Sequence, residues 1–437
     1  MTVNRKGSGL GAVFLVLFVD LIGFSLVFPL FPGMLTWYAD QDGGLLAWLM
    51  RPVDHFFPGV DPWQRAALFG GLLGAVYAML QFVAAPFWGR LSDRYGRRPI
   101  LLVSLVGSFL SNLIWVFAGD FAVLVLSRIL AGAMTGNVAV ANAAVADLTT
   151  AENRSRGMAA VGMAFGLGFI LGPALGGQLA AVRLDLWLPS LVPFGLNPFS
   201  APALFACVLA GINLAWVAWS FSETLPPERR GQGCGPVRVT NPLLIFRNDL
   251  PPQVHAVNLA FFTHTLLFGG LEMTLGFLAA QSLGLGVAAI GFMFGGMGVG
   301  SALVQGAVVR PFGERIGMSR LATIGFAMHI VGFALLALIP SHPSLSLLVT
   351  AVAVQALATG LVFPSLATLV SLASPPERQG FAMGTFRSAS SLGRAFGPLV
   401  LAVAYFASPA LPYWIGAVGM VVPILLIRRV GRVACAS

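Results

Sequence analysis

Twelve long apolar segments, separated by polar stretches, follow one another along the chain. An α-helix needs about 20 apolar residues to cross roughly 30 Å of hydrocarbon, and each segment comes close to that length. The segments are residues 9–35, 66–88, 99–118, 121–146, 157–180, 200–221, 255–280, 287–309, 319–339, 345–370, 381–406 and 411–429. The pattern predicts an all-α integral membrane protein with twelve transmembrane helices.

The longest hydrophilic cytoplasmic stretch in this scheme is 222–254. It separates a predicted N-terminal six-helix bundle, 1–221, from a predicted C-terminal six-helix bundle, 255–437. The halves carry related motifs, because Gly172-Pro173 recurs as Gly397-Pro398 at the matching place in the second half. Two pseudo-symmetric six-helix bundles are typical of secondary transporters, which move one bundle against the other around a site at the midplane.

The composition indicates that most of the protein surface faces lipid rather than water. Hydrophobic residues make up 57% of the chain, charged residues 9%, and the mean hydropathy is +0.86. Of the 25 Lys and Arg, 19 fall in segments that face the cytoplasm if both termini lie inside. This is the positive-inside pattern, so topology explains the net charge of +9 and no nucleic-acid partner is expected. Arginine outnumbers lysine 24 to 1, which suggests a GC-rich bacterial genome and the cytoplasmic (inner) membrane.

Five charged residues lie well inside predicted spans, away from the span ends: Asp20, Arg128, Glu272, Arg387 and Arg394. A charge at the centre of a membrane helix costs about 2.5–3.5 kcal/mol on the insertion scale, so such residues are paired, solvated in a cavity or functional. We predict that Asp20, Arg128 and Glu272 couple transport to protons. A fixed Asp20–Arg128 ion pair that only sets helix packing is the alternative.

Polar residues on three spans are predicted to line a substrate cavity. On the fourth span, Arg128, Thr135 and Asn142 recur at steps of seven and share a helix face. On the seventh span the same spacing joins Asn258, Thr265 and Glu272, and on the eleventh Arg387, Ser391 and Arg394 share a face. The predicted cavity residues are Gln81, Thr135, Asn142, Asn258, Thr265, Arg387, Ser391 and Arg394.

The fifth span contains closely spaced small residues: Gly168, Gly172, Pro173, Gly176 and Gly177. Glycines let two membrane helices approach closely, and proline bends a helix. We predict tight helix packing here.

Several motifs resemble those of a known family. The loop 89–98, GRLSDRYGRR, is similar to the loop that marks the major facilitator superfamily of transporters. Residues 20–32, 126–132 and 172–177 resemble signatures of the first, fourth and fifth spans of its drug–proton antiporter branch, which includes the tetracycline-resistance proteins. Residues 269–275 look closer still to the animal tetracycline-transporter-like members.

The resemblance implies the fold of that superfamily, a role for Arg128 in proton transfer, and organic anions as a substrate class. It also implies a conformational latch, in which Asp93 meets the N-terminus of the eleventh span near Gly380 and Arg97 meets Asp147. The latch residues are Gly89, Asp93, Arg94, Gly96, Arg97 and Asp147.

We therefore predict a monomeric secondary transporter that exports amphipathic drugs or other organic molecules in exchange for protons. A proton-coupled importer, or an organic-anion or lipid carrier, is the first alternative, and a sensor or scaffold that transports nothing is the second. The sequence contains no metal-ligand cluster, phosphate loop or nucleophile motif, so neither an enzyme nor a cofactor is expected.

Overall fold

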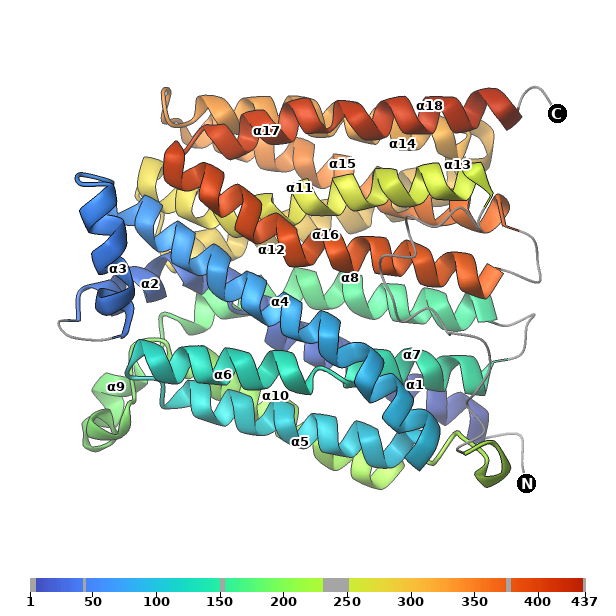
Figure 1. The fold of residues 1–437 in the computed structure, drawn as a ribbon, viewed down its shortest axis with the longest axis horizontal. Coiled ribbons are helices and arrows are strands. Elements are labelled where there is room, and N and C mark those ends of the chain that lie inside the picture. The colour runs from blue at the N-terminus through green and yellow to red at the C-terminus, as the bar shows by residue number, and fades with distance from the viewer. Residues whose placement is uncertain (1–4, 42–44, 150–153, 231–250, 375–378, 435–437) are drawn as a thin grey trace. The chain divides into compact units, whose positions relative to one another are not determined.

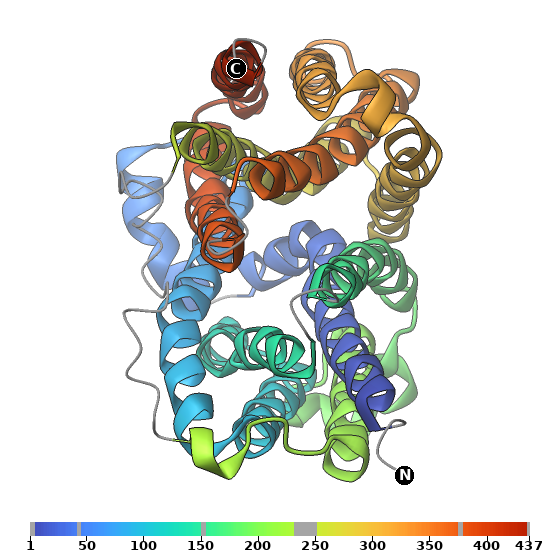
Figure 2. The same ribbon diagram turned by 90° about the vertical axis from the view of Figure 1, so that its right-hand side faces the viewer.

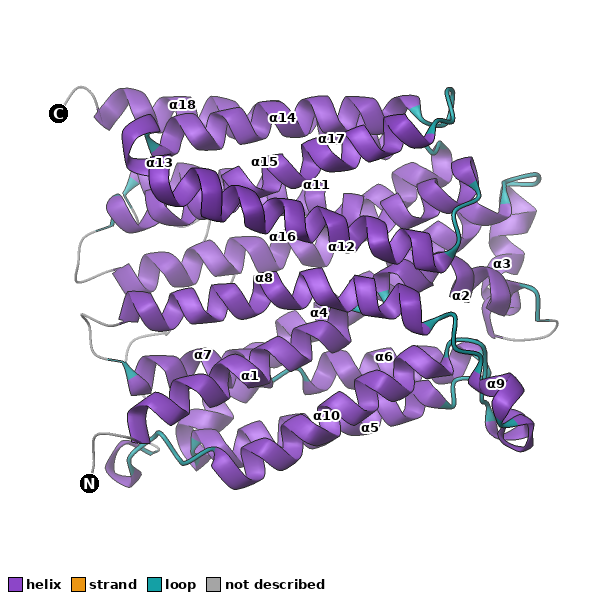
Figure 3. Ribbon diagram, turned by 180° about the vertical axis from the view of Figure 1, so that it is seen from behind, coloured by secondary structure: helices purple, strands orange, loops and turns teal. Residues whose placement is uncertain are grey.

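The protein is helical throughout the part described by its computed structural model, namely residues 5–41, 45–149, 154–230, 251–374 and 379–434. No strand occurs among these residues (Figure 3). Nine of the described helical segments are long and apolar enough to cross a membrane. The other three predicted spans, 66–88, 121–146 and 157–180, also coincide with helices. The prediction of an all-helical membrane protein is confirmed.

The chain forms two compact units. Unit 1 comprises Met1–Pro58, Val76–Val237 and Val287–Gly295, and unit 2 comprises Gly59–Ala75, Arg238–Gly286 and Gly296–Ser437. Helices α4 (Pro62–Tyr95) and α12 (Val287–Val304) therefore each contribute residues to both units. The domain boundaries that we placed at residues 221 and 255 stay a prediction.

Besides Val287–Gly295 of α12, unit 1 contains the helices of the first six predicted spans and the short helices between them (Figure 1). In addition to part of α4, they are α1 (Arg5–Ser25), η1 (Phe28–Leu30), α2 (Phe31–Ala39), α3 (Leu45–Phe56), α5 (Arg97–Val116), α6 (Phe121–Met134), α7 (Asn137–Leu148), α8 (Arg154–Leu179), α9 (Leu184–Trp187), η2 (Pro189–Phe194), α10 (Ser200–Ser220) and η3 (Pro227–Arg229).

Unit 2 contains most of the helices of the second half, which are seen end-on in Figure 2. They are α11 (Pro252–Leu283), part of α12, the π-helical turn η5 (Gln305–Val309), α13 (Arg310–Ile316), α14 (Met318–Leu338), α15 (Leu345–Leu372), α16 (Gln379–Ala407), α17 (Leu411–Gly419) and α18 (Val421–Ala434).

Close helix pairs organise each unit. In unit 1, α1 packs along α8 and α5 packs along α10, and in unit 2 the main pairs are α11 with α16 and α14 with α15. Lipid tails are as apolar as leucine, so such pairs are stabilised mainly by close packing and interhelical hydrogen bonds. The core of unit 1 lies between α1, α5, α7 and α10, where Val16, Leu17, Leu101, Val140 and Val217 are fully buried.

Candidate functional site

Asp20 lies on α1, one of the helices that surround a polar cavity in unit 1. Its side chain is half-buried, and the side chain of Asn137, at the start of α7, faces its carboxylate. An amide can donate a hydrogen bond to a carboxylate, so Asn137 is placed to stabilise the ionised form of Asp20. The sequence pattern did not single out Asn137 as a functional residue.

The fourth span, which carries Arg128, is not a single helix. Helix α6 ends at Met134, Thr135 has ψ of 51°, and α7 begins at Asn137. We predicted one shared face for Arg128, Thr135 and Asn142 from their spacing of seven residues. That spacing places residues on one face only if the helix is unbroken, and this span is broken after Met134. Thr135 lines the cavity with Arg128. The side chain of Asn142 lies outside the described residues.

Side chains of neighbouring spans satisfy the backbone at this break. The Ser104 hydroxyl of α5 donates to the carbonyl of Met134 and accepts from the amides of Gly136 and Asn137, at 3.1 and 2.9 Å. Trp88 of α4 donates from Nε1 to the carbonyl of Ala133 at 2.8 Å. Backbone groups freed at a helix break must find partners inside a membrane, so these bonds allow the break.

Arg128 is buried, with 7% of its surface exposed. Its guanidinium carbon lies 4.4 Å from the ring centroid of Trp115, and its Nε donates to the Ser127 hydroxyl at 3.3 Å. Within the described part of the chain no ion pair joins Arg128 to Asp20, although both line the cavity. The structure therefore does not contain the fixed Asp20–Arg128 ion pair that we considered.

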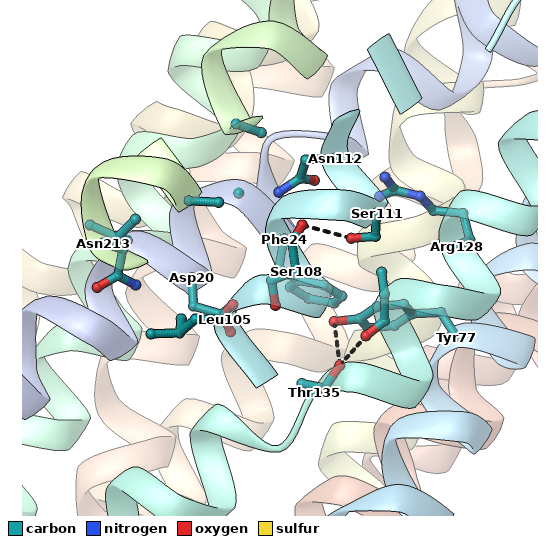
Figure 4. A pocket seen from close by; sticks show the side chains of 15 residues that line it. Asp20, Phe24, Tyr77, Leu105, Ser108, Ser111, Asn112, Arg128, Thr135 and Asn213 are labelled. Atoms are coloured by element: carbon teal, nitrogen blue, oxygen red, sulfur yellow. Dashed lines mark hydrogen bonds between the residues drawn. The ribbon is translucent and has the colours of Figure 1, made fainter. Parts of the chain in front are cut away.

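The cavity that these residues share is small, with a volume of about 50 Å³, and its wall is partly polar. Figure 4 shows that α1, α4, α5, α6 and α10 contribute to its wall. Its polar lining consists of Asp20, Tyr77, Ser108, Ser111, Asn112, Arg128, Thr135 and Asn213. Tyr77, Asn213 and the three polar residues of α5 (Ser108, Ser111 and Asn112) were not among the predicted cavity residues. The spacing of Ser104, Ser108 and Ser111 on one face of an otherwise apolar span was a signal that could have found them.

Tyr77 connects α4 to this cavity. Its hydroxyl lies 3.5 Å from Oγ1 of Thr135, which itself donates to the carbonyl of Ala131 at 2.7 Å (Figure 4). Gln81, a predicted cavity residue, follows one turn later on α4, is half-buried and does not line this cavity.

The loop between α4 and α5 holds a buried arginine between two carboxylates. Arg97, 2% exposed, contacts Asp93 at 2.7 Å and Asp147 at 2.9 Å. Its Nη1 also donates to the Ser92 hydroxyl at 2.7 Å. Gly96 has φ of 104°, a conformation that favours glycine. The ion pair that we expected between Arg97 and Asp147 is present, whereas the contact of Asp93 near Gly380 joins the two units and stays a prediction.

The two remaining latch residues, Gly89 and Arg94, lie in the last turns of α4. Arg94 is exposed and stacks over the Tyr95 ring at 5.3 Å. A Cβ at Gly89 would meet nothing within 4 Å, so packing does not demand glycine there in this structure.

Glu223, just beyond α10, is a further residue that the sequence pattern did not reveal. Its carboxylate accepts from the amides of Arg97 and Arg98, at 2.8 and 3.2 Å, and from those of Thr224 and Leu225, both at 3.0 Å. It therefore satisfies amides at the N-terminus of α5, where a negative charge is also favoured by the helix dipole. This carboxylate fixes the α4–α5 loop to the start of the central loop.

In unit 2, two of the three predicted polar residues of α11 lie in a helix contact rather than along a cavity. Asn258 is fully buried and donates to Thr385 of α16 at 2.9 Å. Thr265 donates to the carbonyl of Phe261, and a Cβ on Gly393 would lie 2.2 Å from its hydroxyl. The close approach of α11 and α16 encloses both residues in this structure, and their assignment to a substrate cavity stays a prediction.

Glu272 is half-buried, and Arg394 of α16 is within electrostatic range of its carboxylate. Arg394 is itself half-buried and packs beside Gly269, one turn before Glu272. Ser391, one turn before Arg394, is exposed. The side chain of Arg387 lies outside the described residues.

The glycine motif of α8 forms the contact with α1. Methyl groups added at Gly168, Gly172 and Gly176 would overlap atoms of residues 21–26. Gly177 approaches α12 instead, because a Cβ added to Gly177 would lie 2.7 Å from the Cα of Gly291. The carbonyl of Pro173 lies at the same contact. The matching glycines of α16, Gly393 and Gly397, face α11 in the same way.

Comparisons with known proteins agree with this arrangement. The sequence profile of the Major Facilitator Superfamily matches residues 13–251 and 257–433. The chain is 34% identical over 425 residues to major facilitator superfamily domain-containing protein 10 of Bos taurus, covering 91% of this chain and 87% of that protein. It is 30% identical to the class C tetracycline resistance protein of Escherichia coli, covering 94% of each. The crystal structure of the human organic anion transporter MFSD10 (TETRAN) superposes with a TM-score of 0.73 at 31% identity, over 97% of this chain and 99% of that one.

Proposed function

Since this chain belongs to the Major Facilitator Superfamily of membrane transporters, we propose that it exports amphipathic organic molecules, organic anions among them, in exchange for protons. The observation that carries the proposal is the position of Asp20. This carboxyl group lies within a membrane-spanning segment, on the wall of a polar cavity that also contains a buried arginine.

Proton coupling follows from the two charge states of that carboxyl group. When ionised, Asp20 can accept a hydrogen bond from the side-chain amide of Asn137, which faces it. When protonated it is neutral and can itself donate a hydrogen bond. If the two conformations of the transporter favour different charge states of Asp20, protonation shifts the equilibrium between them, and substrate binding shifts it back.

Organic anions are supported as a substrate class by two considerations. Away from their ends, the predicted spans contain three arginines and two carboxylates, an excess of positive charge. The human MFSD10 structure, which this chain resembles over almost its whole length, is described as that of an organic anion transporter. We assign the neutralisation of Glu272 to Arg394 and leave Arg387 to meet an anionic substrate group. Replacing Arg387 with Gln should then reduce transport of anions more than that of cations.

The direct test is transport by purified protein in liposomes with a pH gradient. Asp20→Asn should fold normally and exchange substrate down its gradient, but fail to accumulate substrate against it. Asp185→Asn, which removes a carboxylate from a loop outside the spans, is the matched control and should behave like wild type. Uphill accumulation by Asp20→Asn at the wild-type level would refute the role of Asp20.

The same liposomes separate the rival functions. An importer would accumulate substrate on the side opposite to that expected for an exporter, once protein orientation is fixed by protease accessibility. A sensor or scaffold would show no proton flux dependent on any solute.

We further propose that both termini are cytoplasmic, that the protein acts as a monomer, and that it resides in a bacterial inner membrane. Accessibility of engineered cysteines at the two termini of the protein in cells tests the orientation.

A further inference from the structure

The cavity of unit 1 contains a cation whose charge is not directly balanced. Arg128 is buried, and its Nη2 has no hydrogen-bond partner among the described residues. In that part of the chain no carboxylate lies within ion-pair distance of it. Because a buried charge is costly unless it is paired and hydrogen-bonded, the guanidinium calls for an anion.

The surroundings of Arg128 leave one edge of the guanidinium available. Trp115 covers a face of the group, and Ser127 accepts from Nε. Figure 4 shows the guanidinium directed towards the part of the cavity that Ser111 and Asn112 line. Asn112 makes no side-chain hydrogen bond within the described part of the chain, so its amide can donate there.

We propose that this cavity binds one small monovalent anion of the size of chloride, held by the guanidinium group of Arg128 and the side-chain amide of Asn112. Charge-assisted hydrogen bonds from a guanidinium are among the stronger ones in proteins. The volume of about 50 Å³ has room for about three waters at ~15 Å³ each, so an ion with one or two waters fits. A drug-sized molecule, which occupies at least ~300 Å³, does not fit.

Asp20 makes anion binding dependent on pH. It is the one acidic residue among those that line the cavity, so its ionised form repels an anion bound near Arg128. The titratable groups within electrostatic range of Arg128 are Tyr38 of α2 and Tyr77 of α4, and Tyr77 is also within range of Asp20. The hydroxyls of both tyrosines are ordinarily neutral near pH 7. Protonation of Asp20 should therefore strengthen anion binding, and its ionisation should weaken it.

The test measures binding rather than transport, so its outcome is independent of the proposed function. Thermal unfolding of the full-length protein in lipid nanodiscs is followed at constant ionic strength while sodium chloride or bromide replaces sodium gluconate. Wild type should be stabilised saturably by both halides and not by gluconate, which is too large for the cavity. Crystals grown in bromide should show an anomalous peak in the cavity beside the guanidinium group of Arg128.

Variants link the effect to this cavity. Asn112→Leu should bind halide at least about tenfold more weakly, because it loses a hydrogen bond to a charged group. Gln178→Leu, the same change at an exposed amide of α8, should bind like wild type. Asp20→Asn should bind halide with an affinity that no longer falls as the pH rises. The proposal is overturned if halides and gluconate act alike, if Asn112→Leu binds as tightly as wild type, or if the bromide peak is absent and only water occupies the cavity.

Discussion

Gly176 of α8 lies so close to α1 that one added methyl group would overlap the main chain. A Cβ at this position would be 2.1 Å from the carbonyl oxygen of Leu26, and a backbone atom cannot move aside as a side chain can. Ordinary van der Waals contact begins at 3.4 Å, so restoring it requires α1 and α8 to separate by at least about 1.3 Å. We expect Gly176→Ala to lose about 1–3 kcal/mol from overpacking, of which the helix propensity of alanine returns at most ~1 kcal/mol.

Gly296 of α12 provides a matched control, because a Cβ there would meet nothing within 4 Å. Gly296→Ala should therefore be neutral or stabilising by up to ~1 kcal/mol. Both variants are compared with wild type by unfolding in the same lipid nanodiscs, with amide hydrogen exchange reporting on α1 specifically. Equal stability of the two variants, or unchanged protection of α1 in Gly176→Ala, would show that the contact between α8 and α1 is not limited by this glycine.

Three further predictions concern polar contacts. Glu223→Ala removes the acceptor of four amides, so exchange of the first two amides of α5 should accelerate at least about tenfold. Ser104→Ala removes the acceptor of the buried Asn137 amide at the break in the fourth span and should cost about 1–3 kcal/mol in unfolding experiments, whereas Ser111→Ala, whose hydroxyl donates within α5, should cost less. Hydrogen bonds from the Arg183 guanidinium hold the pKa of the Asp185 carboxyl below its usual range. The stability that this pair contributes is therefore present above the ordinary pKa of about 3.9 and is lost as pH falls through the lowered pKa, and NMR titration should show the Asp185 pKa rising in Arg183→Met.

The helices of the fold were predictable because lipid imposes a simple rule on the sequence. A span must present about 20 apolar residues, and each segment found by that rule coincides with helix in the structure. Short-range motifs were also informative. The glycine spacing of the fifth span gives the face of α8 that contacts α1, since residues four apart lie on one side of a helix.

Predictions from residue spacing were less informative where they assumed an unbroken helix with its polar face open to a cavity. Thr135 does not continue the helical face of Arg128, because the helix stops at Met134. Asn258 and Thr265 do form a stripe on α11, but the stripe meets α16. Periodicity along one helix shows which residues share a face, but it does not show which neighbouring helix covers that face.

The sequence by itself determined which segments enter the membrane, which of them carry charge, and which small residues allow two helices to touch, because each of these depends on local composition and on a fixed helical repeat. The tertiary structure decided where the fourth span breaks and which side chains meet Asp20. The break requires a hydroxyl from α5 and an indole from α4 to satisfy its backbone, and the cavity takes its polar wall from five separate helices. Both depend on distances between residues far apart in the chain, and those distances are set by packing.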